Sequence, residues 1–110
     1  MKLPSGQNAI VDIEKLRNYC LNPEHPRGRH KARIFASVLG LTIADVETLR
    51  SRLREAAANE NAIALEADEY GRRFAIDFRV KTGKGEASIR SSWIIRRGED
   101  IPRLTSCFVL

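Results

Sequence analysis

The spacing of apolar residues changes from helical to strand-like at residue 62, and this change restricts the fold more than any other feature. Before it, apolar residues recur every three or four positions. After it they alternate with polar residues, as in Phe74, Ile76, Phe78 and Val80. Helices followed by hairpins predict an α+β domain, in which an antiparallel sheet carries the helices on its apolar face.

The N-terminal half predicts about three helices, over residues 12–20, 30–39 and 42–58. Asp12 and Thr42 are suitable N-caps, and Gly40 is a typical helix C-terminal residue. The expected buried stripe of the second helix consists of Ile34, Phe35, Val38 and Leu39.

The C-terminal half predicts four strands, over residues 62–68, 72–80, 86–96 and 102–110. In the last strand, Leu104, Phe108 and Leu110 are expected on one face, opposite Arg103, Thr105 and Cys107. The connections are short, so a meander is the simplest topology. We expect residues 1–110 to form a single domain.

Charge is unevenly distributed along the chain. Residues 1–70 contain ten Lys/Arg and ten Asp/Glu, whereas residues 71–110 contain nine Lys/Arg and four Asp/Glu, which gives the whole net charge of +5. This distribution suits a polyanionic partner, although a solubilising surface charge is an alternative interpretation.

Neither an apolar run long enough for a bilayer nor the apolar core of a secretory signal is present. With only two cysteines, the chain is expected in the cytoplasm, without contact to a membrane.

The stretch His25-Pro-Arg-Gly-Arg-His-Lys-Ala-Arg-Ile-Phe35 leads into the second helix and contains Arg27, Arg29, Lys31 and Arg33 but no acid. The start of a helix normally disfavours cations, because the positive end of its dipole repels them. These residues therefore predict an anion site, with a solvated basic face as the alternative.

The polar face of the predicted sheet suggests a second cationic surface. Arg90, Ser92, Arg103 and Thr105 fall in one patch if the last two strands are neighbours, and Arg73 lies on the strand before them. Guanidinium and hydroxyl groups together bind phosphate well. The alternative is an ordinary solvated sheet face.

His30 is the one histidine with neighbours suited to catalysis. Metal-free RNA cleavage needs a base for the ribose 2′-OH, cations for the charged phosphorane oxygens and an acid for the leaving 5′-oxygen. His30 can supply the base or the acid, and Lys31, Arg90 and Arg103 can hold the phosphate.

Other sites fit the sequence poorly. Cys20, His25 and His30 match no standard zinc spacing and lack a fourth ligand, so no metal or other cofactor is expected. Ser91 and Ser92 lack the glycines of a hydrolase elbow, and the segment 82–85 is a hairpin turn.

Three segments resemble a family of small bacterial domains of uncharacterised function, found alone and as C-terminal tips of polymorphic and phage-associated toxins. The segments are residues 21–41, 68–78 and 91–110. The matching residues are Leu21, Asn22, Pro23, Gly28, His30, Lys31, Ala32, Phe35, Tyr70, Gly71, Trp93, Ile94, Pro102, Arg103, Leu104 and Thr105. Ser92 stands where relatives commonly have Ala.

In layout this family is similar to the barnase–EndoU–colicin–RelE class of metal-free ribonucleases. The resemblance implies the toxin of a toxin–antitoxin pair, a bacterial endoribonuclease held inactive by a small antitoxin protein. It marks as site residues His30, Lys31, Trp93, Arg103 and Thr105.

The sequence therefore predicts a metal-independent endoribonuclease that leaves a 2′,3′-cyclic phosphate. The expected catalytic residues are His30, Lys31, Arg103 and Thr105, and the expected substrate-binding residues are Arg29, Arg33, Arg73, Arg90 and Ser92. The target is free RNA, ribosome-associated RNA or transfer RNA. Two other functions remain open: a basic module that binds RNA or an acidic partner protein without chemistry, and an antitoxin or scaffold.

Overall fold

The computed structural model describes residues 1–110, and its helices precede its strands as predicted. The helical elements are η1 Gly6–Asn8, α1 Ile13–Lys15, η2 Leu16–Cys20, α2 Arg29–Ile34, η3 Phe35–Leu39, η4 Ile43–Asp45 and α3 Val46–Asn59. The strands are β1 Ile63–Ala64, β2 Gly71–Lys81, β3 Glu86–Arg96 and β4 Arg103–Val109. They form one antiparallel sheet in the order β1-β2-β3-β4, which confirms the α+β class and the meander.

Both predicted N-caps are present. The Asp12 side chain accepts a hydrogen bond from the Glu14 N–H at 2.9 Å. Thr42 caps η4, which continues into α3, and Asp45 accepts a bond from the Thr42 N–H at 2.9 Å, completing a capping box. Gly40 ends η3 with a φ of 69°, a left-handed conformation that glycine adopts without strain.

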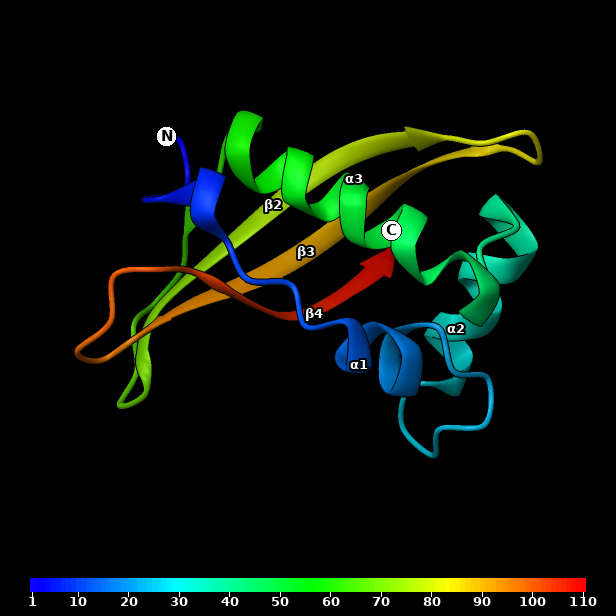
Figure 1. The fold of residues 1–110 in the computed structure, drawn as a ribbon, viewed down its shortest axis with the longest axis horizontal. Helices are drawn as coiled ribbons and strands as arrows, with labels where there is room; N and C mark the ends of the chain where they lie inside the picture. The colour runs from blue at the N-terminus through cyan, green and yellow to red at the C-terminus, as the bar shows by residue number, and fades with distance from the viewer.

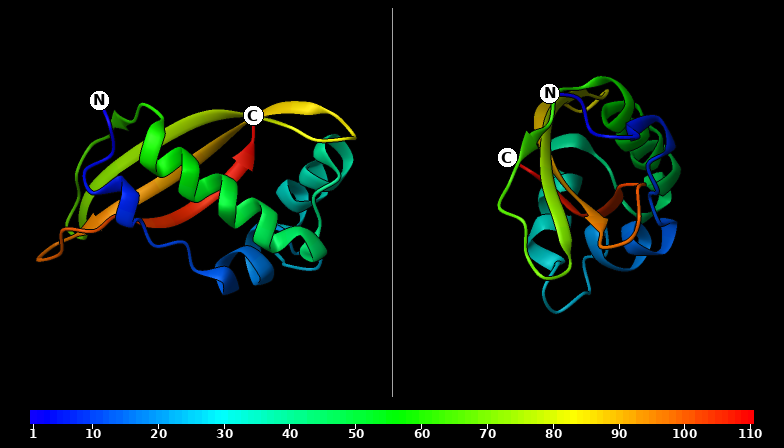
Figure 2. Two further views of the ribbon diagram at one scale, coloured as in Figure 1. Left: turned by 45° about the horizontal axis from the view of Figure 1, so that its top comes forward. Right: turned by 90° about the vertical axis from the view of Figure 1, so that its left-hand side faces the viewer.

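The core lies between α3 and the inner face of the sheet, and α3 crosses that face obliquely (Figures 1 and 2). Leu49 and Leu53 of α3 are fully buried, as is Trp93 of β3. The Trp93 indole N–H donates to the Ser91 hydroxyl at 2.9 Å, and that hydroxyl donates to the Ile76 carbonyl at 2.9 Å. Trp93 is thus a core residue with its polar atom satisfied.

Two sequence predictions about individual elements are wrong. The first strand spans only Ile63–Ala64 instead of residues 62–68, because the chain beyond Ala64 keeps only isolated bonds to β2, such as that from the Leu65 N–H to the Arg73 carbonyl at 2.9 Å, and no regular ladder. In the second helix Ile34 is 42% exposed and Val38 36% exposed. Only a narrow face of this helix packs against the rest of the molecule, and the side chains of Ile34 and Val38 lie outside that face.

The predicted alternation in the last strand is also wrong beyond Leu104. Trp93 pairs with Leu104 but Ser92 pairs with Ser106, so Thr105 is the extra residue of a β-bulge. The bulge shifts the side-chain period by one residue. Cys107 consequently faces the core, and Phe108 lies opposite Arg90 on the other face of the sheet.

Candidate nucleic-acid interface

The loop before α2 is held in place by the side chains of its own histidine and tyrosine. The His25 Nδ1 accepts hydrogen bonds from the N–H groups of Arg27 and Gly28, each at 3.0 Å. The His25 ring also meets Tyr19 edge to face, with 4.7 Å between ring centroids. A Cβ added to Gly28 would lie 2.8 Å from the Tyr19 carbonyl oxygen, so this close approach requires glycine. These contacts fix where α2 begins.

The other end of the helical segment is held by the β2–β3 hairpin. The Thr82 hydroxyl donates to the Leu39 carbonyl at 2.7 Å, and the Lys84 ammonium donates to the Ala36 carbonyl at 3.2 Å. Leu39 is the last residue of η3, where carbonyl groups lack helical partners, whereas the Ala36 carbonyl also accepts a hydrogen bond from the Gly40 N–H at 3.0 Å. The α2–η3 segment is therefore anchored at both ends, and it lies beside the C-terminal end of β4 (Figure 1).

Lys31 of α2 reaches the uncovered face of the sheet. Its ammonium lies 4.5 Å from the centroid of the Phe108 ring, a cation–π contact. Arg90 lies directly opposite Phe108 on β3 and Ser92 opposite Ser106. We call this cluster the Phe108 site; it comprises Lys31, Asp77, Arg90, Ser92, Ser106 and Phe108.

Within the Phe108 site, Arg90 forms a bidentate pair with Asp77. The two contacts are Nε to Oδ1 at 2.8 Å and Nη2 to Oδ2 at 2.9 Å. The hydrogen bond from Arg90 lowers the pKa of Asp77 below its usual value, and the same pair raises the pKa of Arg90. The pair fixes the plane of the guanidinium and leaves Lys31 as the cation of this site without an acidic partner.

The cations around the start of α2 have no acidic partners. None of the ion pairs in the structure includes Arg27, Arg29, Lys31 or Arg33. The Arg29 guanidinium donates to the Pro26 carbonyl at 3.1 Å, and the His30 side chain is exposed. By contrast, the sheet arginines at positions 73, 79, 90 and 103 all pair with carboxylates. Four unpaired cations therefore lie close together in the sequence at the start of α2, while others, such as Arg96 and Arg97, lie elsewhere on the surface.

The opposite end of the uncovered face forms a second groove, with a cavity volume of about 420 Å³. It is lined by Glu69, Tyr70, Arg73, Ile94, Arg96, Arg97 and Thr105. Arg73 is paired with Asp68 at 2.9 Å, whereas Arg96 and Arg97 form no ion pair. Two of the predicted site residues, Arg73 and Thr105, thus line this groove, away from the Phe108 site.

Arg103 is the first residue of β4 and pairs with Glu99 at 3.2 Å. Phe108, which Lys31 contacts, is five positions further along the strand, a separation of about 16 Å. His30 lies next to Lys31 but on the side of α2 that faces away from the buried Ala32. The structure therefore brings together Lys31, Arg90 and Ser92, and it does not bring His30 to Arg103.

Sequence reasoning missed Phe108 and Ser106 as parts of the site, because the bulge at Thr105 leaves no clear signature in the sequence. It also placed Asp77 on the polar face without recognising its pairing with Arg90. That pairing could have been found, because aligning the hairpin on its turn makes the two residues direct neighbours.

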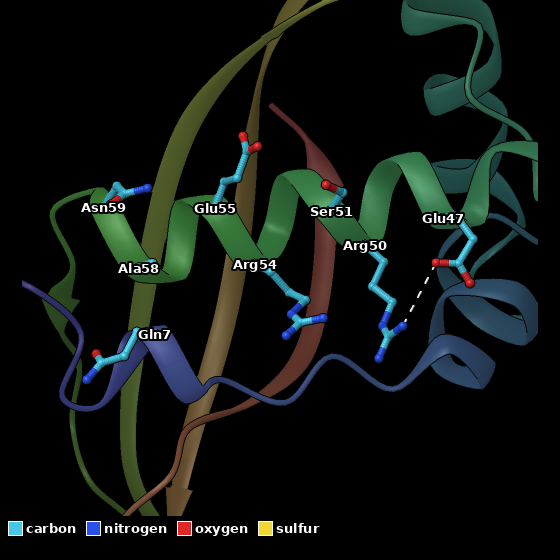
Figure 3. Close-up of a pocket in the computed structure, with 8 residues that line it drawn as sticks. All are labelled: Gln7, Glu47, Arg50, Ser51, Arg54, Glu55, Ala58 and Asn59. Atoms are coloured by element: carbon cyan, nitrogen blue, oxygen red, sulfur yellow. Dashed lines mark ion pairs between the residues drawn. The ribbon is translucent and has the colours of Figure 1, made fainter.

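A separate polar groove runs along α3 beside η1 (Figure 3). Arg50 donates to the Val11 carbonyl at 3.0 Å and pairs with Glu47 at 3.9 Å. Arg54 and Glu55 also line the groove, so its charges balance. None of the predicted site residues lies here, and the groove shows no preference for anions.

The two cysteines are free thiols buried in the core. A hydrogen bond with Cys20 and burial raise the pKa of Cys107 well above its ordinary value, which keeps this thiol protonated and unreactive. Histidine, cysteine and acidic side chains form no cluster of three or more that could hold a metal ion. No helix has the length and hydropathy of a bilayer-spanning segment.

The chain matches a known protein family. Residues 2–110 match the family described as "Domain of unknown function (DUF6883)". No curated protein matches the chain. Because the match extends over nearly the whole chain, this protein belongs to the DUF6883 family.

Proposed function

We propose that this protein binds single-stranded RNA along the uncovered face of its sheet, beginning at the Phe108 site. The observation that carries the proposal is the placement of two cations beside a partly exposed Phe108 ring, with Lys31 over the ring and Arg90 opposite Phe108 on β3. Proteins bind single strands by stacking bases on exposed aromatic rings while nearby cations hold the phosphates.

Arg96 and Arg97, which form no ion pair, extend this surface at the other end of the sheet face. RNA that passes from α2 over Phe108 and along β4 would next meet Thr105 and the groove that contains Arg96 and Arg97. On this proposal Arg103 and Thr105 contact phosphates a few nucleotides away from Lys31, because along the strand Arg103 lies about 16 Å and Thr105 about 10 Å from Phe108.

Fluorescence anisotropy with labelled oligouridine tests the binding proposal. We expect Lys31→Ala, Arg90→Ala and Phe108→Leu each to weaken binding about fivefold or more, since a stacked base contributes about 1–3 kcal/mol. Phe108→Leu keeps an apolar side chain at a half-buried position and so limits damage to the fold. The matched control is Arg54→Ala, on the charge-balanced groove of α3. Unchanged affinity in all three variants would exclude this site.

A second candidate function is metal-independent cleavage of the bound RNA. It is favoured by His30, which is exposed, makes no hydrogen bond and directly precedes Lys31, whereas the Nδ1 of His25 already accepts two hydrogen bonds. In this proposal the His30 imidazole takes the proton of a ribose 2′-OH, and the 2′-oxygen attacks phosphorus. As the bond from phosphorus to the 5′-oxygen breaks, that oxygen takes a proton from solvent water and the His30 imidazolium returns its proton to solvent. A 2′,3′-cyclic phosphate remains, and Lys31 stabilises the phosphorane oxygens.

Incubation of labelled RNA with the purified protein and a chelator separates the two functions. Cleavage to a cyclic phosphate, lost in His30→Ala while anisotropy still reports binding, is the result expected of an endoribonuclease. Binding without cleavage in the unmodified protein would leave the non-catalytic RNA-binding module.

We further propose that the biological setting is the bacterial cytoplasm, where the protein acts as the toxin of a toxin–antitoxin pair. The proposal is supported by the resemblance given above and by the two unpaired thiols. Induced expression is expected to arrest growth, and co-expression of the neighbouring gene is expected to relieve the arrest. Normal growth on induction would instead favour an antitoxin or scaffold role.

A further inference from the structure

An apolar pocket lies on the flank of α2 that faces away from Lys31. Its volume is about 210 Å³, below the roughly 300–1,000 Å³ of typical small-molecule sites. It is lined by Leu21, Pro23, Ala32, Arg33, Ala36, Thr42, Ile43 and Ala44. The size and lining suit a single apolar side chain of a protein better than a metabolite.

The pocket has an exposed apolar residue at its edge. Ile43, which lines it, is 39% exposed, and no element of the chain covers this side chain. Apolar side chains gathered in this way around a hollow are typical of interaction sites.

The charge around the pocket indicates which kind of ligand can bind there. Arg33 lines the pocket without an acidic partner, and Arg29 lies one helical turn before it. No acidic residue lines the pocket, and none occurs in α2 or η3. A ligand with carboxylates beside an apolar anchor complements this surface, whereas a basic or wholly apolar one does not.

We propose that this flank of α2 docks an acidic segment of a partner protein, which inserts one apolar side chain into the pocket beside Arg33. On a helical projection Arg33 and Lys31 lie about 200° apart, so the docking surface and the Phe108 site occupy opposite flanks of one helix. The docking proposal therefore uses a surface distinct from the proposed RNA site and can fail or succeed separately.

Two synthetic peptides test the docking proposal. One consists of Glu and Asp residues around a single central Leu, and the other replaces that Leu with Ser. We expect the Leu peptide to bind at least about tenfold more tightly, because a buried anchor dominates such contacts. Amide chemical-shift changes are expected at Arg33, Ala36, Ile43 and Ala44. Equal binding of the two peptides, or shifts elsewhere, would overturn the proposal.

Two variants separate the contributions of the apolar pocket and of the Arg33 charge to peptide binding. Ala36→Phe fills the pocket and is expected to remove the preference for Leu while oligouridine binding stays unchanged. Arg33→Glu is expected to weaken both peptides, and Arg54→Glu, with the same charge change on α3, is expected to weaken neither. If oligouridine rather than peptide shifts the pocket amides, the surface belongs to RNA and the docking proposal is wrong.

Discussion

Asp77 and Arg90 show how one residue pair links stability to the candidate site. Their side chains are partly exposed, with 38% and 44% of side-chain surface accessible, so solvent screens their attraction. The pair nevertheless cancels a charge beside Phe108 and orients the guanidinium. Its main effect is therefore on the electrostatics of the site rather than on folding.

The lowered pKa of Asp77 predicts a pH-dependent stability difference between the unmodified protein and Asp77→Asn. A carboxyl whose pKa is lower in the folded state stabilises the fold above its unfolded pKa, near 3.9, and this contribution disappears as the pH falls through the folded pKa. Thermal melts at stepped pH should show a lower Tm for the variant at neutral pH and convergence under acid conditions.

The control for this comparison is Asp100→Asn, since Asp100 forms no ion pair. Its melting curve should follow that of the unmodified protein at each pH. A Tm difference between Asp77→Asn and the unmodified protein that persists unchanged at low pH would contradict the assigned cause.

At the scale of elements, the site depends on where α2 begins. Gly28 lies against the Tyr19 backbone and ring, so Gly28→Ala must move the loop or the helix. We expect a loss of about 1–3 kcal/mol in the free energy of unfolding, the usual effect of overpacking, together with weaker oligouridine binding. Urea titration and anisotropy measure the two effects.

The matched control for Gly28→Ala is Gly83→Ala. A Cβ at Gly83 meets nothing within 4 Å, and its φ is not in the positive region. Gly83→Ala should leave both stability and binding near those of the unmodified protein. Equal behaviour of the Gly28 and Gly83 variants would show that the Tyr19 contact does not position α2.

The same scale shows what the sequence could and could not predict. The alternation of apolar and polar residues identified the inward face of β2 and β3 correctly, because both strands pair regularly along their length. It failed in β4, where Thr105 is an unpaired extra residue, and in the second helix, where Ile34 and Val38 have no partner to cover them. Local pattern predicts amphipathicity, but tertiary contacts decide which apolar residues become buried.

For the whole molecule, the unequal distribution of charge predicts strong salt dependence of RNA binding. Single-stranded nucleic acid gives a slope of about −0.7 in log K against log salt for each neutralised phosphate. Engagement of four cations along the proposed path, Lys31, Arg90, Arg96 and Arg97, predicts a slope between about −2 and −3.

Anisotropy titrations over a range of salt concentrations measure this slope. Lys31→Ala should reduce its magnitude by about 0.7, because one phosphate contact is lost. The Arg54→Ala slope should equal that of the unmodified protein. A slope near zero would mean that these four cations do not contact RNA.

For the whole molecule, the sequence predicted the order of the elements and the excess of positive charge well, but it predicted the arrangement of the site only in part. The order of helices and strands follows from periodicity, and the excess of cations follows from composition. The separation of His30 from Arg103 does not follow from either, because it depends on which end of β4 adjoins α2. Periodicity assigns residues to faces of an element but carries no information about distances between elements.

The extra residue at Thr105 decides which side chains of the last strand reach the uncovered face of the sheet. If Thr105 stayed and paired regularly with Ser92, every later residue would move one position along β3 and change faces. Ser106 and Phe108 would then turn inward against the helices, while Cys107 and Val109 would face solvent. Such a slip of register would remove the aromatic platform and open the hydrophobic interior, whereas deletion of Thr105 itself would leave Phe108 outside, because Ser106 would then follow Leu104 directly.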